Sequence, residues 1–319
     1  MTTPTPPVQL PGIPSTLLPP TITAPIFAKA LETSTVMQMA RRVPLAMDAT
    51  TAIPVPLDVP TADWVSEGGV KPLSSGGVGV KTMTGKKVAT LVPVSMEVAT
   101  TNAAGLYQQL QNDLPTAISR AFDTAAIHGK TMKGSAGPFQ DYLTLTTKSI
   151  TLGTTAQSKG GIYADLVTGM AEVTEDDWDF TGFVADKRLK PQLLLATDTQ
   201  GRPIFVDTTT GGTDAAGNGT LLGEPLAYGS GISGKYRRQS SSTDSGLRAI
   251  GGDWSQCAFG IGQDISVKVS TEATYVDEAG TVHSAFQENL VLLLVEAYFG
   301  FVLGEPEAFV KYLGAPQAS

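Results

Sequence analysis

The sequence predicts an α+β protein built around one long buried strand near the C-terminus. Residues 290–303 (LVLLLVEAYFGFVL) are apolar except for Glu296 and Gly300, which is typical of a strand buried on both faces or covered by a helix on one side. Residues 102–128 carry an apolar stripe with helical spacing. Between these two elements, residues 160–271 alternate short helical and strand patterns, which indicates a separate α+β lobe.

The overall composition limits the class of protein. A chain of 319 residues exceeds the size at which one core usually stops growing, so two lobes are expected. The net charge of −8 argues against a nucleic-acid binder that works through a basic face. Cys257 is the single cysteine, which excludes an internal disulfide and favours a small buried side chain. No segment resembles a signal peptide or a membrane helix, so a protein made in a reducing cytoplasm is expected.

The N-terminal part of the chain predicts an extended arm. Residues 1–25 hold eight prolines and no charged side chain, so they can form neither a helix nor an inner strand. Such an arm has no core of its own and is expected to lie against another surface, for example another copy of the chain. Residues 26–47 begin with helix-like spacing and end with Arg41, Arg42 and Pro44.

A long hairpin is predicted next, over residues 52–97. Its strands are expected around residues 64–65 and 88–94, on either side of the glycine-rich residues 68–85. Few large apolar side chains occur along it, so the hairpin is expected to need an outside partner for stability.

The helix over residues 102–128 is the clearest local prediction. Apolar side chains recur every four residues, and Gly129 is expected to end the helix. Pro115 is expected to kink or split it. Ser119, Arg120 and Asp123 lie away from the apolar stripe, so we expect an amphipathic helix packed on a sheet with these residues on the other side.

The middle lobe carries the remaining predicted elements. Helices are expected at residues 162–173 and 186–196, and strands at residues 180–185, 226–228, 258–261 and 265–271. Residues 207–220 are polar and lack periodicity, which indicates a loop.

Metal chemistry is not expected from the histidines and acidic residues. His128 falls at the end of the long helix, where a histidine ordinarily satisfies the helix dipole. His283 lies in a polar turn, and the two histidines share no ligand spacing with cysteine or acids. Four acidic residues at positions 175–179 are expected to form a solvated turn, because the calcium-loop pattern is missing.

One segment resembles a phosphate-binding loop. Residues 229–235 (GSGISGK) have the right glycine and lysine spacing, but Tyr236 stands where a serine or threonine would hold magnesium. A nucleotide-dependent enzyme using Lys235 is therefore an alternative hypothesis. No nucleophile elbow or catalytic triad is apparent, so the sequence predicts neither an enzyme nor a cofactor.

Glu296 is the single charge inside the long apolar strand. A buried lone carboxylate is costly unless it is paired or protonated. We expect either a structural ion pair, with Arg120 as the partner, or a proton acceptor for a lysine amine.

The order of these elements resembles that of the major capsid proteins of tailed bacteriophages, the Hong Kong 97 phage type. The marks that carry the resemblance are residues 64–72 (WVSEGGVKP), 121–129 (AFDTAAIHG) and 289–310, and it covers about residues 26–313. The resemblance implies the following division of the chain. Residues 1–47 form the N-terminal arm, 48–97 the extended loop, 98–150 the peripheral domain with its spine helix, 151–275 the axial domain, and 276–319 the return to the peripheral domain.

The resemblance also implies a function. Subunits would self-assemble as pentamers and hexamers into an icosahedral shell, part of the virion, that encloses double-stranded DNA without sequence-specific binding. Assembly would occur in the host bacterial cytoplasm, away from any membrane, with a portal and with optional, separate scaffolding or decoration proteins. No long helical extension precedes residue 26, so any scaffolding protein is expected to be separate. The alternative on the same fold is an encapsulin-type nanocompartment shell.

The resemblance suggests which residues meet neighbouring subunits. The interface candidates are Trp64, Glu67, Lys71, Lys86, Arg41 and Arg42. Some relatives join subunits by an isopeptide bond between a loop lysine and an asparagine, helped by a glutamate, and many relatives keep similar residues without the bond. In this chain Asn289 and Glu296 stand at the matching positions, and Lys71 or Lys81 would be the loop lysine.

Overall fold

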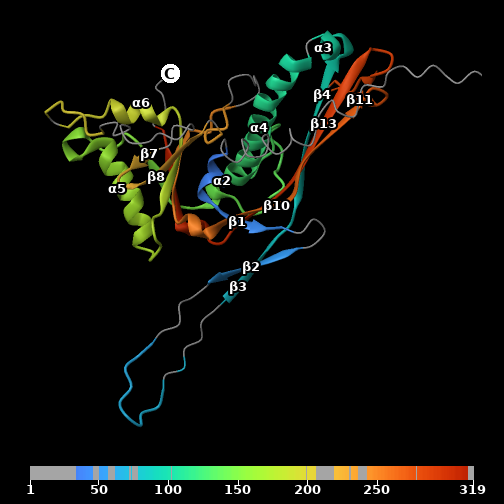
Figure 1. Cartoon of the computed structure of the whole chain (residues 1–319). Coiled ribbons are helices and arrows are strands. Elements are labelled where there is room, and N and C mark those ends of the chain that lie inside the picture. The colour runs from blue at the N-terminus through green and yellow to red at the C-terminus, as the bar shows by residue number, and fades with distance from the viewer. Residues whose placement is uncertain are drawn as a thin grey trace, which may run out of the picture.

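The chain folds into two lobes and a projecting hairpin (Figure 1). The computed structural model describes residues 34–45, 50–56, 62–71, 73, 78–101, 103–198, 200–205, 219–229, 231–235, 243–277 and 279–314. The spine lobe consists of a four-stranded sheet covered by the long helix α4. The mixed lobe consists of a six-stranded sheet with two helices. The predicted arm at residues 1–25 and most of the predicted loop at 207–220 lie outside the described residues.

The spine sheet is built around the predicted long strand. Its strand order is β1 (Arg41–Pro44), β10 (Cys257–Ser270), β13 (Leu290–Leu303) and β4 (Lys86–Ser95). The prediction for β13 is confirmed at both ends. Residues 258–261 and 265–271, predicted as two strands, form the single strand β10, because bulges absorb the irregular segment between them.

The two faces of β13 have different neighbours, because successive side chains in a strand point to opposite sides. One face packs on α4 through a set of buried apolar residues: Leu293, Val295, Ala297, Phe299, Phe301 and Leu303. Phe122 of α4 meets this face, with ring centroids 5.6 Å from Phe299 and 6.1 Å from Phe301. The prediction of an amphipathic helix on a sheet is therefore confirmed.

Helix α4 (Ala103–His128) follows the short helix α3 (Met96–Thr101). It runs through Pro115 without a break, so the expected split does not occur. The expectation that Ser119 and Asp123 lie on the solvent side is wrong, because both are buried. The helix α2 (Thr35–Met39) covers this second flank of α4 and gives Asp123 its hydrogen-bond partners.

The mixed sheet has apolar neighbours on both faces. Its order is β5 (Ser149–Thr151), β14 (Phe309–Leu313), β9 (Leu247–Gly252), β6 (Gly182–Asp186), β8 (Glu224–Gly229) and β7 (Gly219–Leu221). On one face lie α5 (Gly161–Thr174) and α6 (Leu189–Leu194). The other face joins the core of the spine lobe through Val184, Ala227 and Ile250. The two lobes thus share one continuous core.

Strand pairing differs from the predicted division of the chain. Strand β10 falls within residues 151–275, yet it pairs with β13 in the spine lobe. Strand β14 falls within residues 276–319, yet it pairs with β9 in the mixed lobe. The chain therefore passes between the lobes near Trp254–Gln256, a 3-10 turn between β9 and β10, and again near Pro306–Ala308. Two further 3-10 turns span Leu143–Leu145 and Gln157–Lys159.

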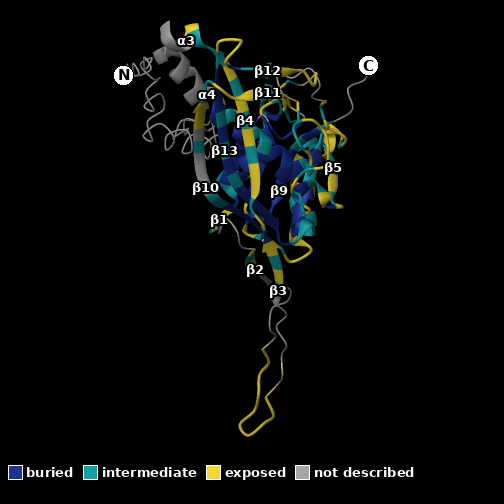
Figure 2. Ribbon diagram, turned by 90° about the vertical axis from the view of Figure 1, so that its right-hand side faces the viewer, coloured by how far each residue is buried: buried dark blue, intermediate teal, exposed yellow. Residues whose placement is uncertain are grey.

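The projecting hairpin exists, but its strands are not the predicted ones. Strands β2 (Thr51–Pro56) and β3 (Val78–Met83) pair antiparallel at its base, while residues 64–65 lie in the connection. Residues 88–94 belong to β4 in the spine sheet, because alternate valines there pack against the core under α4. Figure 2 shows the exposed hairpin extending from the buried core of the body.

A second, smaller hairpin joins β10 to β13. It consists of β11 (Thr274–Val276) and β12 (Val282–Ser284). Within the described ranges, no helix is long and apolar enough to cross a membrane.

Candidate functional site

The connection at the end of the projecting hairpin exposes large apolar side chains. Trp64 is 101% exposed, Val70 95% and Leu73 99%. The Trp64 amide donates to Asp63 Oδ1 at 2.8 Å, and a turn closes where the amide of Gly69 donates to the carbonyl of Ser66. Apolar groups held so far from the body contribute nothing to the subunit's own core, so they are typical of a docking element.

Glu67 and Lys71, the charged interface candidates on the hairpin, are exposed in the same connection. The other three lie on edge strands of the spine sheet. Arg41 and Arg42 are exposed on β1, and Lys86 is exposed at the start of β4. Charged side chains on edge strands discourage unspecific strand pairing, so these positions present charge to any neighbour that approaches the sheet edges.

The base of the hairpin is fastened to the body. Lys81 of β3 donates to Asp141 Oδ2 at 3.0 Å and to the Leu303 carbonyl at 2.7 Å. Ile53 and Met83 are buried in a small apolar cluster at the same place. Lys81 is therefore engaged within its own subunit, whereas Lys71 is the exposed lysine near the tip.

Glu296 forms a structural ion pair, but its partner is not Arg120. Its carboxylate, 12% exposed, pairs with Lys87 of β4 and lies 3.5 Å from Lys268 Nζ of β10. Glu296 belongs to the set of β13 side chains that point away from α4, the helix that carries Arg120. The hydrogen bond from Lys87, and then the attraction of both lysines, hold the pKa of Glu296 below its usual value.

The three isopeptide candidates do not come together within one subunit. Asn289 precedes β13 with a φ of 51°, and its carbonyl accepts from the Met96 amide at 2.9 Å. Seven residues of extended strand separate it from Glu296, which is about 23 Å. A bond involving Lys71, Asn289 and Glu296 would therefore need groups from more than one subunit.

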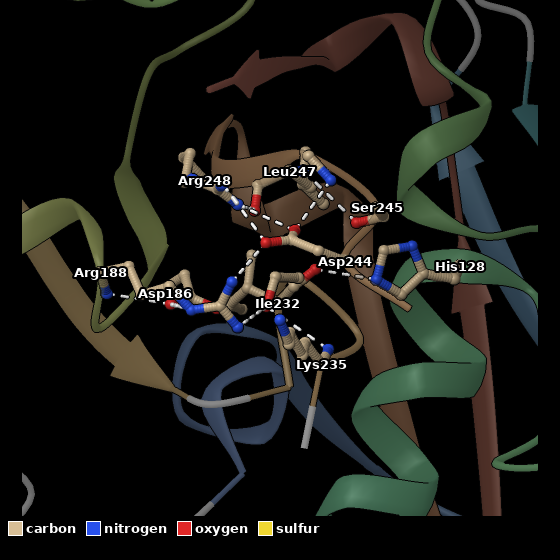
Figure 3. Close-up of polar contacts among 11 residues, drawn as sticks. His128, Asp186, Arg188, Ile232, Lys235, Asp244, Ser245, Leu247 and Arg248 are labelled. Atoms are coloured by element: carbon tan, nitrogen blue, oxygen red, sulfur yellow. Dashed lines mark hydrogen bonds and ion pairs between the residues drawn. The ribbon is translucent and has the colours of Figure 1, made fainter. Parts of the chain in front are cut away.

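The glycine-rich loop at residues 229–235 is closed by its own ionic network (Figure 3). Arg188 donates to Ser233 Oγ at 3.1 Å and pairs with Asp244. Arg248 donates to the other oxygen of Asp244 at 3.0 Å. Asp186 is buried beside them and accepts the Arg188 amide at 2.9 Å.

This network bears on the nucleotide hypothesis. The charges beside the loop balance, because Arg188 and Arg248 pair with Asp186 and Asp244, so this network offers no net positive charge to a phosphate. Lys235 ends the loop, and residues 236–242, which would form the helix that follows a phosphate loop, lie outside the described part of the chain. The geometry favours a structural loop.

Both histidines have protein partners. His128 Nε2 lies 2.8 Å from the Ile232 carbonyl, and burial lowers the pKa of this histidine. His283 lies between Glu288 and Asp277, and the hydrogen bonds from its ring to these carboxylates, Glu288 first, raise its pKa. Among the residues that the structure describes, no cluster of histidine, cysteine and acidic side chains is suited to hold a metal ion.

The predictions for Cys257 and for the acidic turn are confirmed. Cys257 is fully buried, and burial raises the pKa of its thiol. The four acidic side chains at positions 175–179 are exposed, and Asp176 pairs with Lys148 at 2.6 Å.

Comparison with known proteins gives matches over most of the chain. Residues 15–313 match the phage capsid family. The chain is 32% identical over 295 residues to the probable major capsid protein gp17 of Mycobacterium phage D29, covering 89% of this chain and 86% of that protein. It is 30% identical over 297 residues to the protein of the same name in Mycobacterium phage L5, covering 89% and 85%.

Solved structures agree with the sequence matches. A chain from Gordonia phage Cozz is similar with a TM-score of 0.71 and 28% identity, covering 89% of this chain and 87% of that chain. A chain from Mycobacterium phage Ogopogo has a TM-score of 0.69 at 19% identity, covering 89% and 92%, which extends the likeness of fold to a more distant sequence.

Proposed function

The chain belongs to the phage capsid family, has the Hong Kong 97-type fold and is a major capsid protein, and from this premise we propose how it builds its shell. Subunits assemble with copies of themselves as pentamers and hexamers in a closed icosahedral capsid. The projecting hairpin of each subunit lies on a neighbour and buries Trp64, Val70 and Leu73 there. The observation that carries this proposal is the complete exposure of these three side chains on a hairpin whose base is fixed.

Heterologous contacts suit such an assembly. A hairpin on one surface and its seat on another make a head-to-tail contact, and head-to-tail contacts close into rings. Arg41, Arg42, Lys86, Glu67 and Lys71 supply charges at the sheet edges and near the tip. In this proposal they orient neighbouring subunits, since complementary charges fix register more than they add affinity.

We assign the lobes by analogy with relatives. The spine lobe corresponds to the peripheral domain and the mixed lobe to the axial domain near the symmetry axes. The strand pairing supports a boundary near Trp254–Gln256 and not at residue 275.

The shell is a virion component, and we propose that it assembles in the host cytoplasm and encloses double-stranded DNA. With a net charge of −8, the chain would enclose DNA without tight or sequence-specific binding. A portal, and a separate scaffolding or decoration protein, are the further partners that this function calls for.

Two other functions are less well supported. The chain's place in a structural capsid family favours a shell protein over an enzyme. The pairing of Arg188 and Arg248 with Asp186 and Asp244 leaves no net positive charge in the network beside the loop, which disfavours a nucleotide site there. An encapsulin-type compartment would share the fold, but the relatives named above are phage proteins.

A covalent link between subunits is a separate proposal. In it, Lys71 of one subunit attacks the Asn289 side chain of a second, releasing ammonia, with Glu296 of a further subunit near the amine. The engagement of Lys81 at the hairpin base supports Lys71 as the lysine. Boiling assembled shells in SDS gives a ladder of bands if the bond forms; Lys71→Arg then removes the ladder and Lys81→Arg keeps it. A single monomer band excludes the link.

The test of the shell function is electron microscopy and light scattering of the purified chain expressed alone. Closed particles tens of nanometres across are the expected result. A protein that remains monomeric at every concentration, with or without a scaffolding partner, would contradict the proposal.

A further inference from the structure

The short helix α2 lies at the junction of the two lobes. Its five residues are too few to hold a helix without tertiary contacts, yet Val36 and Met37 are buried in the shared core. On one side α2 packs against the mixed sheet, and on the other it faces α4 of the spine lobe. Helix α2 is therefore a wedge whose position depends on both lobes.

Two glycines of the mixed sheet leave room for this wedge. A side chain at Gly229 of β8 would have its Cβ 2.3 Å from Thr35 Cγ2. A side chain at Gly182 of β6 would have its Cβ 2.3 Å from Met39 Cε. Real contacts do not come so close, and the short Thr35 side chain cannot move away, so β8 needs a glycine at position 229 for α2 to fit. At Gly182 the flexible end of Met39 could move aside, and the tight contact that remains is with the Pro225 carbonyl oxygen, 3.0 Å from the added Cβ.

Asp123 of α4 holds α2 from the spine side. Its Oδ1 accepts from the Ser34 hydroxyl at 2.6 Å and from the Val36 amide at 3.4 Å. Its Oδ2 accepts from the amide and from the hydroxyl of Thr35, each at 3.1 Å. Ser34 in turn caps α2 by accepting the Met37 amide at 3.2 Å. One carboxylate thus satisfies the first turn of α2.

Burying the Asp123 carboxylate costs free energy, because the charged group is taken out of water. Asp123 is 3% exposed, and its four contacts come from neutral hydroxyl and amide groups. A buried carboxylate held by neutral donors adds less stability than a well-packed apolar pair would, but it specifies one geometry. The hydrogen bonds fix the rotation and the register of α2 on α4, which apolar contacts alone would leave adjustable.

We infer that Asp123 is a positioning residue: it fixes α2 at one rotation and register between the two lobes, and so sets the position at which the chain enters the body at Ser34. This role is a property of the single subunit.

The test compares Asp123→Asn with the unmodified full-length chain by hydrogen exchange in the unassembled subunit. The asparagine keeps the shape but replaces one acceptor oxygen by an amide donor, which leaves either the Thr35 or the Val36 amide unpaired. Exchange at the amides of α2 should become about tenfold faster or more, while the amides of β13 keep their protection. Asp113→Asn, an exposed change on the same helix, is the matched control.

Milder variants keep the test decisive if Asp123→Asn does not fold. Thr35→Val removes one hydroxyl donor to Asp123 and retains the backbone contacts. Ser34→Ala removes the other hydroxyl donor together with the cap on the Met37 amide. Each should also speed α2 exchange, and either one combined with Asp123→Asn should add less than its separate effect, because both act on the same contact. Unchanged α2 exchange in these variants would overturn the inference.

Assembly is measured separately by electron microscopy of the same proteins. If the variants exchange faster at α2 but the unmodified chain forms no shells, the shell function is refuted and the role of Asp123 stands. If the unmodified chain forms shells but Asp123→Asn leaves the α2 exchange unchanged, the shell function stands and the role of Asp123 is refuted.

Discussion

Glu296 and Lys87 form an ion pair across neighbouring strands, β13 and β4, on the face of the spine sheet that points away from α4. Lys268 of β10 approaches the same carboxylate from the other side. The single charge in the long apolar strand thus joins three strands on the open face. This explains why an otherwise apolar strand tolerates a glutamate.

Replacing Glu296 by glutamine should lower the melting temperature only slightly, by less than about 3 °C, because partly exposed ion pairs contribute little. Differential scanning calorimetry measures the change, with the exposed Glu272→Gln as the control. A large loss of stability would show that the ion pair holds the three strands together more strongly than its exposure suggests.

Trp64→Ala should leave the folding of the subunit unchanged, because the indole is fully exposed. Particle yield should fall by about tenfold or more if the indole is an anchor at the subunit contact, as buried tryptophans at interfaces often are. Sedimentation and electron microscopy count the particles, and Ser66→Ala in the same turn is the control. Normal yield would show that Trp64 is dispensable for assembly.

Lys81→Met should loosen the base of the hairpin. It removes the hydrogen bonds to Asp141 and to the Leu303 carbonyl, so exchange of the β2 and β3 amides should rise by about tenfold. Lys86→Met, at an exposed site on the next strand, should have no such effect. Equal exchange in the two variants would mean that the apolar cluster at the base suffices.

Asp123 should make stability depend on acidity. Burial raises its pKa to about 6, although the hydrogen bonds of Ser34 and Thr35 oppose the shift, and α2 carries no titratable side chain. The native state therefore binds the proton more tightly than the unfolded chain does. Below about pH 4 this difference adds about 3 kcal/mol to the free energy of unfolding, and the added stability is lost as the pH rises through about 6.

Urea unfolding between pH 4 and 7 measures the free energy of unfolding, and the difference between the unmodified chain and Asp123→Asn isolates the contribution of Asp123 from that of the other titrating groups. Asp113→Asn should keep this contribution. If the pH dependence of the free energy of unfolding is the same in Asp123→Asn as in the unmodified chain, it belongs to another group.

His128 should act in the opposite direction. Because the Ile232 carbonyl only accepts, the Nε2 atom of the neutral ring carries the hydrogen, and burial lowers the pKa below 6.5. The unfolded chain then binds the proton more tightly, so stability is lost as the pH falls below about 6.5. The same urea series with His128→Gln, which keeps a donor but cannot titrate, should lose this acid-side decline.

Periodic segments were predictable from the sequence. The apolar stripe in α4 and the apolar run in β13 mark the residues that are buried, so the pattern predicts both the type and the bounds of these two elements. Strand β9 (LRAIGG) was missed although it lies near the centre of the mixed sheet. Its two glycines lower strand propensity, and only packing against neighbouring strands reveals why they are there.

The site residues show the same limit. The local pattern predicts Asp123 to be a solvated residue on an amphipathic helix. It gives no sign that α2, more than 80 residues earlier in the sequence, covers this residue. The sequence suggests Arg120 as the partner of Glu296, and this is wrong, because the face on which Glu296 lies depends on strand register. The exposure of Trp64, in contrast, agrees with the prediction that the hairpin cannot bury its own side chains.

The direct passage from β3 into β4 has a mechanical consequence. Only Thr84 and Gly85 separate the two strands, and both views show the hairpin continuing the line of β4 (Figures 1 and 2). Tension on the tip is therefore carried along β4 into its antiparallel pairing with β13, from Lys86 opposite Phe299 to Ser95 opposite Leu290. Such a ladder is loaded in shear, so its hydrogen bonds must yield together instead of unzipping one at a time. If internal pressure in a shell pulls on the hairpins, the load acts along the strands, the direction in which the sheet resists best.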